Sequence, residues 1–461
     1  MKTVLIIAGS DPGAGAGLQQ DLKAATLLGT YGLTVVTALT VQNSQGVRAV
    51  QPVAPELTAA QLEAVLNDFP VYAIKIGMLA TAANVRVVAA TLREFLRGGP
   101  GKTSKPPVVL DPVLAAGQGE LLLEEEGVAV LKDELFPLTY LLTPNVPEAA
   151  RLTGMRIETP ACLEKAARCL QALGPQWVLA KGGHLPGAPV DVLTDGKNAY
   201  HLENPRLAAP HHHGSGCLLA TALASQLANG LSVPEAVNKA RALVLQALRH
   251  GLPLGQGVGP VNTSAPFARE LARYGVLQAL DAAAARLVKE DLSPLIPEAM
   301  SNLGYAVCYP EGPQDVAAFP GRILKTPAGL LIPAGPAFGA SPLLAAVILT
   351  AMETFPNLRS AMNIRYFEDI ERLAPQLHLR AVGFNRTEAP ADAQASEEET
   401  LAWGIATVMK NLPAWEPPPD LVYDPGGWGK EPMIYILGET PLQVVEKALA
   451  WKNAIAVARR H

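Results

Sequence analysis

The sequence predicts an α/β fold with a mostly parallel sheet, followed by a second and smaller α/β unit. A short apolar run at 4–8 enters a glycine-rich loop at 10–17, and a helix-forming run begins at Leu18. A buried strand, a tight loop and a helix start form the βα unit of a parallel sheet. Similar apolar runs recur through the first half of the chain, and several of them end in polar residues. With 461 residues the chain is too long for one typical core, so two or three domains are expected.

The composition is that of a folded globular protein, with 49% hydrophobic and 17% charged residues. The net charge of -5 and the pI of about 6.0 give no electrostatic reason to expect nucleic acid or anionic lipid as a partner. No stretch approaches the roughly 20 apolar residues of a membrane span, and the first apolar run ends too early, at Gly9, for a signal peptide. The four cysteines form no CxxC pair, which is consistent with a reducing cytoplasm. We therefore expect a cytoplasmic homo-oligomer that binds small molecules.

The loop at 10–17 carries glycines in the pattern GxGxG, which invites a dinucleotide-binding interpretation. That fingerprint requires a further glycine where this chain has Leu18, and no GK[ST] follows to complete a Walker loop. The glycines are better explained by a close approach of the backbone to a small flat substrate. Asp11 and Asp21 are placed to order such a loop.

Polar residues follow several of the predicted strands. Gln42 lies beyond the strand at 34–39, on the side where parallel α/β sheets bind ligands. Its amide can donate to and accept from a heteroaromatic ring, or it can instead satisfy the backbone of a turn. Lys181 follows the strand at 177–180 and precedes two glycines, so its ammonium can reach phosphate oxygens as a point charge.

Three oxygen-bearing side chains follow two further strands. Asp111 follows the strand at 108–110 and is locked by the next proline, whereas Asn145 and Glu148 lie just after the strand at 140–142. These ligands suit Mg²⁺, which keeps several waters and takes few protein carboxylates. Glu148 taken alone can also be an ordinary acidic residue in the first turn of a helix.

A serine between two glycines opens a predicted helix. Gly214, Ser215 and Gly216 precede Cys217, and a strongly helix-forming run follows at 218–229. The first N–H groups of a helix have no internal partners, and its dipole places about half a positive charge there, so this turn can bind a phosphate. The same field lowers a thiol pKa from its free value of about 8.5, and we expect this for Cys217. The alternative is an ordinary glycine-rich loop with a buried cysteine.

Together these stretches resemble the ribokinase-like superfamily and, within it, the hydroxymethylpyrimidine/phosphomethylpyrimidine kinases of thiamine synthesis. The resemblance covers about 1–262 and implies a three-layer α/β/α sandwich. Sugar kinases of the superfamily carry an aspartate in place of Cys217, which favours the pyrimidine branch. The family loop usually reads Gly-Thr-Gly-Cys, and Ser215 keeps the hydroxyl of the threonine. The matching stretches are Ala8-Gly-Ser-Asp-Pro12, Gly15-Ala-Gly-Leu-Gln-Gln-Asp-Leu-Lys23, Thr37-Ala-Leu-Thr-Val-Gln-Asn43, Lys75-Ile-Gly-Met-Leu79, Asp111-Pro-Val113, Thr143-Pro-Asn-Val-Pro-Glu148, Lys181-Gly-Gly-His184, His213-Gly-Ser-Gly-Cys217 and Gly255-Gln-Gly-Val-Gly-Pro260.

The resemblance implies two in-line phosphoryl transfers from MgATP. The first goes to the hydroxymethyl oxygen of 4-amino-5-hydroxymethyl-2-methylpyrimidine and the second to the resulting monophosphate. The backbone amides of Gly214, Ser215, Gly216 and Cys217 would hold the transferring phosphoryl group, whose charge Lys181 would neutralise. Cys217 is the candidate base for the alcohol. The second transfer uses an already ionised phosphate and should depend on Cys217 less.

Two alternatives stay open for the first half of the chain, which could be a pyridoxal-type kinase or a nucleotide binder without activity. The resemblance to the pyrimidine kinases also implies the remaining ligand contacts. The implied contacts are Asp111 and Glu148 for Mg²⁺, Asn145, Lys181 and Thr194 for the nucleotide, and Gln42, Ala16, Asp21 and Met78 for the pyrimidine.

The second half begins after a glycine-rich boundary at 255–264. A long amphipathic helix is predicted at about 265–289 and no internal repeat relates the two halves. We therefore expect one domain at 1–262 and a second at 263–461, linked by this helix.

The second half carries its own candidates for a phosphate site. Ser341 and a following proline precede an apolar helix as N-cap and first-turn residue, again a helix start that can bind an anion. Arg322, Arg365 and Lys430 are cations that could contact the same phosphate. Each of the three can also be a solvated surface charge or a structural ion pair.

These stretches resemble the archaeal-type thiamine-phosphate synthase domain, which couples the pyrimidine diphosphate with a thiazole phosphate. The resemblance covers about 300–455, with 361–366 and 429–438 its most specific parts. The family run continues Ser-His-Val-Ala-Arg, whereas here Leu343 replaces the expected histidine, and leucine can neither donate a hydrogen bond nor carry charge. This half is therefore either a synthase with a rearranged site or a module that binds thiamine phosphate or holds subunits together. We favour the binding module.

Overall fold

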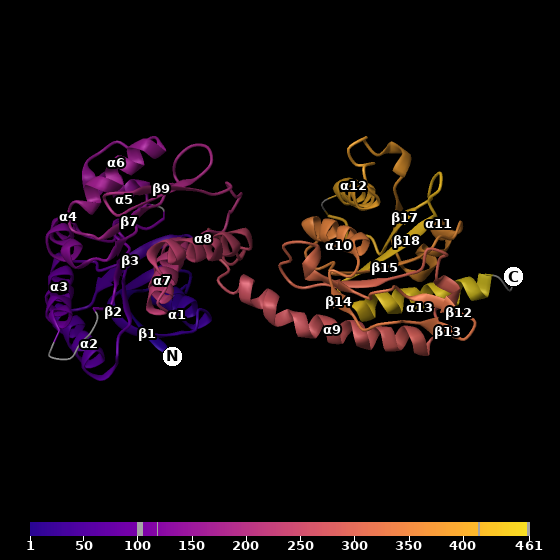
Figure 1. Ribbon diagram of the computed structural model, residues 1–461, viewed down its shortest axis with the longest axis horizontal. Helices are drawn as coiled ribbons and strands as arrows, with labels where there is room; N and C mark the ends of the chain where they lie inside the picture. Colours follow the sequence, from indigo (N-terminus) through magenta and orange to yellow (C-terminus); the bar gives the residue numbers. More distant parts are fainter. Residues whose placement is uncertain (99–104, 118, 414, 459–461) are drawn as a thin grey trace. The chain divides into compact units, whose positions relative to one another are not determined.

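The computed structural model describes residues 1–98, 105–117, 119–413 and 415–458 (Figure 1). The chain forms two compact units, Met1–Pro266 and Phe267–His461. The expected α/β fold with a second unit is confirmed, and each unit has its own sheet. No helix in the described residues is both long and apolar enough to span a bilayer.

The first unit is built on a sheet of nine strands in the order β3-β2-β1-β4-β5-β6-β7-β8-β9. The strands from β2 to β7 in this order are parallel, whereas β3, β8 and β9 run antiparallel to their neighbours. Parallel strands bring their carboxyl ends to one edge, as the sequence predicts. The strands are β1 Lys2–Ser10, β2 Thr30–Asn43, β3 Gly46–Pro52, β4 Ala73–Ile76, β5 Val108–Leu110, β6 Leu141–Leu142, β7 Trp177–Ala180, β8 Val190–Thr194 and β9 Ala199–Glu203.

Helices cover both faces of this sheet, which confirms the three-layer sandwich (Figure 1). Alternate residues of β1 point to opposite faces: Leu5 and Ile7 pack with α2 to α6, whereas Val4 and Ile6 pack with α1, α7 and α8. The helices are α1 Gly17–Leu27, α2 Pro55–Asp68, α3 Ala82–Arg97, α4 Glu125–Val130, α5 Val146–Thr153, α6 Pro160–Gln171, α7 Ser215–Ala228 and α8 Val233–Arg249.

The strand that carries Gln42 is longer than predicted. β2 continues through Asn43 and pairs antiparallel with β3, so Gln42 lies opposite Val47 inside a hairpin rather than in a loop after the strand. The polar residues at the tip did not end the strand, because the hairpin partner satisfies their backbone groups.

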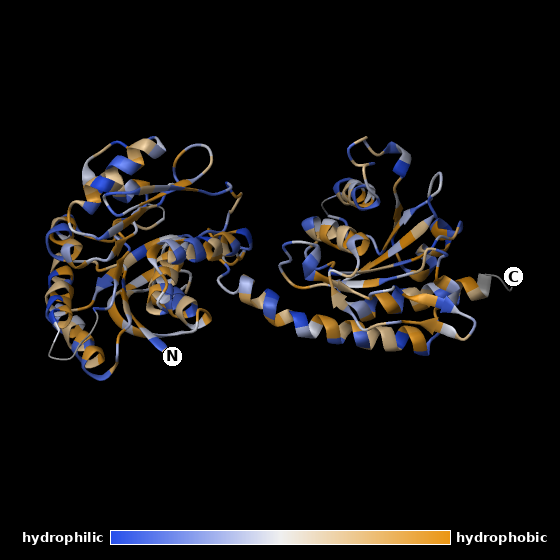
Figure 2. Cartoon of the chain, in the orientation of Figure 1, coloured by the Kyte–Doolittle hydropathy of each residue, from blue (hydrophilic) through white to orange (hydrophobic). Residues whose placement is uncertain are grey.

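The second unit has a seven-stranded sheet in the order β14-β11-β10-β15-β18-β17-β16. The sheet is mostly antiparallel, and β16 and β17 are its parallel pair. Helices α10 and α12 pack on one face, while α9, α11 and α13 pack on the other. Figure 2 shows apolar residues along the strands of both sheets. The elements are β10 Leu303–Ala306, β11 Val316–Ala318, β12 Leu324–Thr326, β13 Gly329–Leu331, β14 Ala337–Phe338, β15 Ser360–Arg365, β16 Ala381–Gly383, β17 Leu421–Asp424, β18 Met433–Gly438, α9 Ala265–Lys289, α10 Pro342–Thr354, α11 Ile370–Leu373, α12 Glu397–Lys410 and α13 Pro441–Ala458.

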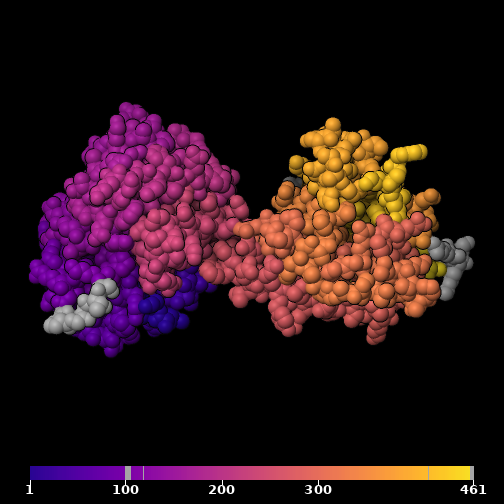
Figure 3. All heavy atoms as spheres, in the orientation of Figure 1, coloured from indigo at the N-terminus to yellow at the C-terminus, as the bar shows by residue number. Residues whose placement is uncertain are grey.

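Helix α9 lies along the outside of the second unit, at the predicted residues (Figure 3). Val276 and Leu280 on its inner side are buried in the core. Its outer side is not polar, since Leu271 is 81% and Tyr274 is 71% exposed. The prediction of an amphipathic helix is therefore correct in position but wrong in pattern.

Candidate functional site

The start of α7 meets the loop after β1. Gly214, the N-cap of α7, has a φ of 82°, and a Cβ at this position would overlap the carbonyl oxygen of Gly15. Only glycine combines this left-handed conformation with so close an approach. The two glycine-containing turns are thereby held against each other, although Gly15 and Gly214 are 199 positions apart in the sequence.

The same turn faces two of the predicted phosphate-site residues. A Cβ placed on Gly216 would lie 3.5 Å from both Asp111 Oδ2 and Lys181 Nζ. The amide of Ser215 donates to the His212 carbonyl oxygen, so it is already engaged. The amides of Gly216 and Cys217 have no hydrogen-bond partner among the described residues and remain available to an anion.

Asp111 and Lys181 form an ion pair at the ends of β5 and β7. Lys181 Nζ lies 2.9 Å from Asp111 Oδ1, which also accepts a hydrogen bond of 3.1 Å from Thr143 Oγ1. Burial opposes the charge of Lys181, but Asp111 and Glu148 outweigh it and raise the pKa of Lys181. Its ammonium is therefore a permanent positive charge beside the α7 turn.

Asn145 and Glu148 form a capping box at the start of α5. Asn145 Oδ1 accepts from the Glu148 amide at 2.8 Å, and Glu148 Oε2 accepts from the Asn145 amide at 2.7 Å. Burial raises the pKa of Glu148 to about 7; Lys181 opposes this shift and Asp111 adds to it. Glu148 is thus the acidic residue in the first turn of a helix that was considered as an alternative, and its buried carboxylate still lies near Asp111 and Lys181.

Asp111 and Glu148 are the carboxylates at this site that could hold a metal ion. No group of three or more His, Cys, Asp and Glu side chains in the described part of the chain is arranged to hold a metal. Asp111 and Glu148 are nevertheless two buried carboxylates near one lysine, and the negative charge they concentrate suits a divalent cation that keeps most of its waters. The residues therefore fit Mg²⁺.

The loop after β1 forms the opposite wall. The Asp11 carboxylate accepts hydrogen bonds of 2.8, 3.1 and 2.9 Å from the amides of Gly13, Gly15 and Ala16, so it orders the loop as expected. His213 Nε2 lies 3.1 Å from Asp11 Oδ2 and 3.2 Å from Gln42 Nε2. Burial opposes ionisation of Asp11, but His213 and the loop amides lower its pKa. Because these amides bind Asp11, the loop is not a phosphate cradle.

His213 has no predicted role, although it lies between two predicted site residues. The signal available in the sequence was its position directly before Gly214. Met78 is 7% exposed and packs in a small apolar cluster with Ala38 and Ala80. Its sulfur lies 3.0 Å from the point where a Cβ on Gly9 would stand, so it borders the end of β1.

Asp21 does not face the site, which corrects its predicted role. Its side chain is fully buried, with Oδ2 2.6 Å from Lys75 Nζ and Oδ1 accepting a 2.7 Å hydrogen bond from Thr221. Burial opposes the charge of Lys75, but the pair with Asp21 outweighs it and raises the pKa of Lys75 to about 12. Lys75 was missed as a site residue; a lysine inside the apolar run of β4 was the available signal.

Thr194 lies at the wrong end of the sheet for a nucleotide contact. β8 is antiparallel to β7, so Thr194 pairs with Val178 at the start of β7 while Lys181 follows its end. The Thr194 hydroxyl donates to the Asn198 carbonyl oxygen at 2.6 Å and accepts from the Gly196 amide at 3.0 Å. It holds the β8–β9 turn instead.

The thiol of Cys217 is harder to ionise than the sequence predicts. Burial raises its pKa to about 11; the charge of Lys75 opposes this, and the charges of Asp21 and Asp111 add to it. The prediction considered the helix field alone, and the cost of burying a thiolate is larger. At neutral pH the thiol is therefore protonated.

Three candidates in the second unit, Arg322, Arg365 and Lys430, lie next to strand ends at one edge of its sheet. Arg365 ends β15 and pairs with Met433, the first residue of β18, and Lys430 lies just before that strand. Ser341 caps α10 by accepting from the Leu344 amide at 3.3 Å, and Leu344 packs on Gly304 near the start of β10. Arg322 follows β11, which ends beside the start of β10.

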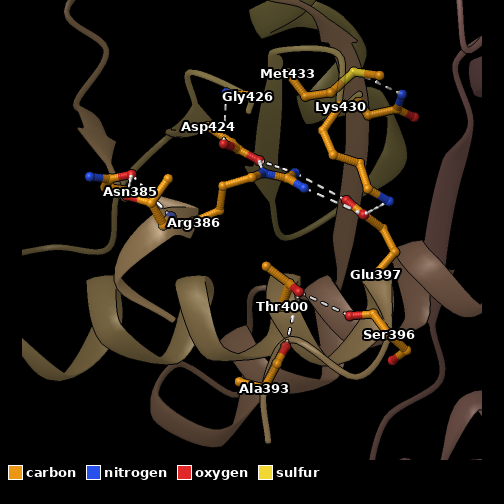
Figure 4. A network of polar contacts seen from close by, with 12 residues as sticks. Asn385, Arg386, Ala393, Ser396, Glu397, Thr400, Asp424, Gly426, Lys430 and Met433 are labelled. Atoms are coloured by element: carbon orange, nitrogen blue, oxygen red, sulfur yellow. Dashed lines mark hydrogen bonds and ion pairs between the residues drawn. The ribbon is translucent and has the colours of Figure 1, made fainter. Parts of the chain in front are cut away.

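An ion-pair network occupies part of this edge (Figure 4). Arg386 contacts Asp424 and Glu397, with Nε 2.9 Å from Asp424 Oδ2, and Lys430 pairs with Glu397. Asp424 is fully buried and accepts from the Gly426 amide at 2.9 Å. Lys430 is thus a structural ion pair, one of the alternatives considered for it, and Arg386, Glu397 and Asp424 were missed.

The two other cations are less constrained. Arg322 donates to the Ala299 carbonyl oxygen at 2.6 Å, and the Arg365 guanidinium lies 4.8 Å from the Phe367 ring centre. Neither has a carboxylate within ion-pair distance among the described residues. Leu343 is partly buried against the core between α10 and α12. The second unit therefore has two cations without a carboxylate partner among its described residues, and no proton donor at position 343.

The comparisons with known proteins agree with the two-unit division. Residues 11–262 match the family model of phosphomethylpyrimidine kinase, and residues 279–450 match that of thiamine-phosphate synthase ThiN. Over 259 residues the chain is 45% identical to the hydroxymethylpyrimidine/phosphomethylpyrimidine kinase of Streptomyces coelicolor, covering 56% of this chain and 93% of that protein.

A bifunctional relative and a solved structure add to this. The chain is 47% identical over 261 residues to the thiamine biosynthesis bifunctional protein ThiED of Geobacter sulfurreducens, covering 56% of this chain and 52% of that protein, so it spans about half the length of that relative. The pyridoxal kinase of Staphylococcus aureus in complex with AMP-PCP and pyridoxal superposes with a TM-score of 0.51 at 33% identity, covering 57% of this chain and 94% of that one.

Gly214→Ala should lower kcat/KM for phosphoryl transfer by about 10²-fold or more, because the added methyl group separates the α7 turn from the loop after β1. The matched control is Gly230→Ala at the other end of α7, where φ is 92° but no atom lies within 4 Å of the new Cβ. This control should cost about 1 kcal/mol of stability and leave turnover unchanged. Wild-type kinetics for Gly214→Ala would show that the close approach is not needed.

The reactivity of Cys217 should report its raised pKa. Below a pKa of about 11 the thiolate fraction rises tenfold per pH unit, so its carboxymethylation rate should still be increasing between pH 8 and pH 10. Peptide mass spectrometry after timed reaction with iodoacetate measures this rate. A plateau at or below pH 8 would contradict the raised pKa.

Proposed function

Since the chain belongs to the phosphomethylpyrimidine kinase family, we propose that its first unit transfers the terminal phosphoryl group of ATP to 4-amino-5-hydroxymethyl-2-methylpyrimidine and then to the monophosphate. The observation that carries this proposal is the contact of the α7 start with Asp111 and Lys181 on one side and the loop after β1 on the other. This turn can hold a phosphoryl group between the nucleotide and the acceptor.

Phosphoryl transfer needs positioning and charge neutralisation more than covalent help. The free amides of Gly216 and Cys217 bind the transferring group, and Lys181 neutralises part of its charge. Asp111 and Glu148 hold Mg²⁺, which when bound offsets the charge of the ATP phosphates. Asn145 remains a nucleotide contact through the start of α5, whereas Thr194 is too far along the sheet to be one.

The wall opposite Asp111 is proposed to bind the pyrimidine. Gln42 and His213 together supply donors and acceptors that suit the amino group and ring nitrogens of a flat heterocycle. The ordered backbone at Ala16 lets the ring approach closely, and Met78 provides an apolar contact. Asp11 fixes both His213 and the loop, so it orients this wall without touching the ring.

Product analysis tests the proposal directly. The whole chain is supplied with MgATP and either the pyrimidine alcohol or pyridoxal, because a pyridoxal kinase shares the fold. We expect the alcohol to give monophosphate and then diphosphate, with kcat/KM for pyridoxal at least about tenfold lower. A higher kcat/KM for pyridoxal than for the pyrimidine alcohol would show that the first unit is a pyridoxal kinase.

Cys217→Ala should reduce phosphorylation of the alcohol more than phosphorylation of the monophosphate. Only the alcohol must lose a proton, and general base catalysis contributes about 10²–10⁴-fold. Because burial raises the pKa of Cys217 to about 11, the base is the minor thiolate form of this residue. Initial rates with each acceptor at saturating MgATP measure the difference, and Cys169→Ala, an exposed cysteine on α6, is the control. Equal loss of both activities, or loss of neither, would remove Cys217 from the base role.

For the second unit we propose binding of thiamine phosphate without synthase chemistry. Arg322, Arg365 and the capped start of α10 at Ser341 provide an anion site. Arg322 and Arg365 can offer positive charge to a departing diphosphate, but neither Pro342 nor Leu343 can donate a proton or a hydrogen bond to it. The domain match to thiamine-phosphate synthase therefore accounts for the ligand, and the altered first turn of α10 accounts for the missing chemistry.

Calorimetric titration of the whole chain with thiamine phosphate should show binding, and Arg322→Met should weaken it by about tenfold or more, the value of one charge-assisted hydrogen bond. Lys410→Met at the far end of α12 is the matched control and should leave the affinity unchanged. In parallel, pyrimidine diphosphate and thiazole phosphate should give no thiamine phosphate. Turnover comparable with that of the kinase unit would establish a synthase instead.

A further inference from the structure

A fully buried ion pair lies in the core of the first unit. Lys75 sits in the four-residue strand β4, and its ammonium lies 2.6 Å from Asp21 Oδ2 on α1. Both side chains are inaccessible to solvent. Such pairs seldom add stability, because the loss of hydration of two charges offsets their attraction, and apolar residues of similar volume often serve as well. The stability of the fold therefore does not explain why these charges are here.

The position of the pair does suggest a reason. Asp21 Oδ1 accepts a hydrogen bond of 2.7 Å from Thr221, which follows Cys217 by one turn of α7. Residues four apart lie on the same face of a helix, and side chains lean toward its N-terminus. Thr221 thus points Asp21 toward the face that carries Cys217.

Lys75 reaches the same place from the sheet. Its Nζ lies 2.9 Å from the point where a Cβ on Gly77 would stand, so the ammonium lies just under the end of β4, at the edge that carries the site. Its charge interacts with Cys217 and with Asp111 as well as with Asp21. The pair therefore lies between the end of β4 and the first two turns of α7.

We propose that Lys75, held in place by Asp21, is a positioning residue of the kinase reaction: it keeps a fixed positive charge beneath the Gly214–Cys217 turn and stabilises negative charge on the Cys217 sulfur and on the transferring phosphoryl group. The proposal rests on the function proposed for the first unit. Preorganised charge of this kind needs no rearrangement during the reaction.

Four charged side chains from different parts of the fold act on the Cys217 thiol. Lys75 of β4 and Lys181 after β7 favour a negative sulfur, whereas Asp21 of α1 and Asp111 after β5 oppose it. Removing Lys75 should therefore lower the reactivity of the thiol, and removing the charge of Asp21 should raise it. A purely structural pair predicts the same direction for both, since loosening the packing exposes the thiol in either case.

The main test is the double variant Lys75→Met with Asp21→Leu, which replaces the pair by apolar side chains of similar volume and should remain folded. We expect kcat for the pyrimidine alcohol to fall about tenfold or more, with KM for alcohol and ATP within about threefold of wild type. Carboxymethylation of Cys217 at one fixed pH should slow modestly relative to Cys169, the internal reference in the same digest, because the effect of Lys75 on the thiol exceeds the opposing effect of Asp21.

Two single variants complete the experiment. Asp21→Asn leaves Lys75 charged and should accelerate carboxymethylation of Cys217, while Thr221→Val removes the hydrogen bond without changing any charge and should leave that rate within about twofold of wild type. If Asp21→Asn does not fold, the double variant and Thr221→Val still decide the matter.

Wild-type kcat and wild-type thiol reactivity in the double variant would overturn the proposal, as would acceleration of carboxymethylation in both the double variant and Asp21→Asn. A different result would show that the proposed kinase function itself is wrong. The wild-type chain would then not phosphorylate the pyrimidine alcohol at all, while the opposite effects of Lys75 and Asp21 on Cys217 would persist.

Discussion

The first unit depends on the contact between Gly214 and the carbonyl oxygen of Gly15, because this contact joins the start of α7 to the loop after β1. The sheet places Asp111 and Lys181 at the ends of β5 and β7, and α7 brings two free amides against them. Any side chain at 214 would push these parts away from each other. A left-handed glycine at 214 is therefore the condition for this arrangement of the α7 start, Asp111 and Lys181.

Electrostatics then sets what the site can do. Asp111 and Glu148 lie at the site beside Lys181, and the buried pair of Asp21 and Lys75 lies behind it. Burial raises the pKa values of Glu148 and Cys217, and the charge of Asp111 adds to both shifts, so a divalent cation beside Asp111 would oppose them. Magnesium binding and the state of the thiol are thus linked through the same charges.

In the second unit, several of the charged side chains are neutralised by ion pairs. Lys430 and Arg386 form ion pairs with Glu397 and Asp424. These pairs stabilise the loop before β18, and the two cations are not free to bind a ligand. Arg322 and Arg365 have no carboxylate within ion-pair distance among the described residues. The first turn of α10 carries Pro342 and Leu343, which offer no acid, and the binding without synthase chemistry proposed for this unit rests on that difference.

By itself the sequence determined the strand, loop and helix order of the first unit, the site residues at strand ends and the helix start at Gly214, because local periodicity and turn residues decide these features. Only the tertiary structure decided which polar side chains face one another. Asp21 turned inward to Lys75, Thr194 fell at the far end of an antiparallel strand, and burial reversed the expected shift of the Cys217 pKa. Each of these depends on neighbours distant in the chain, and on how much water they exclude, which no local pattern encodes.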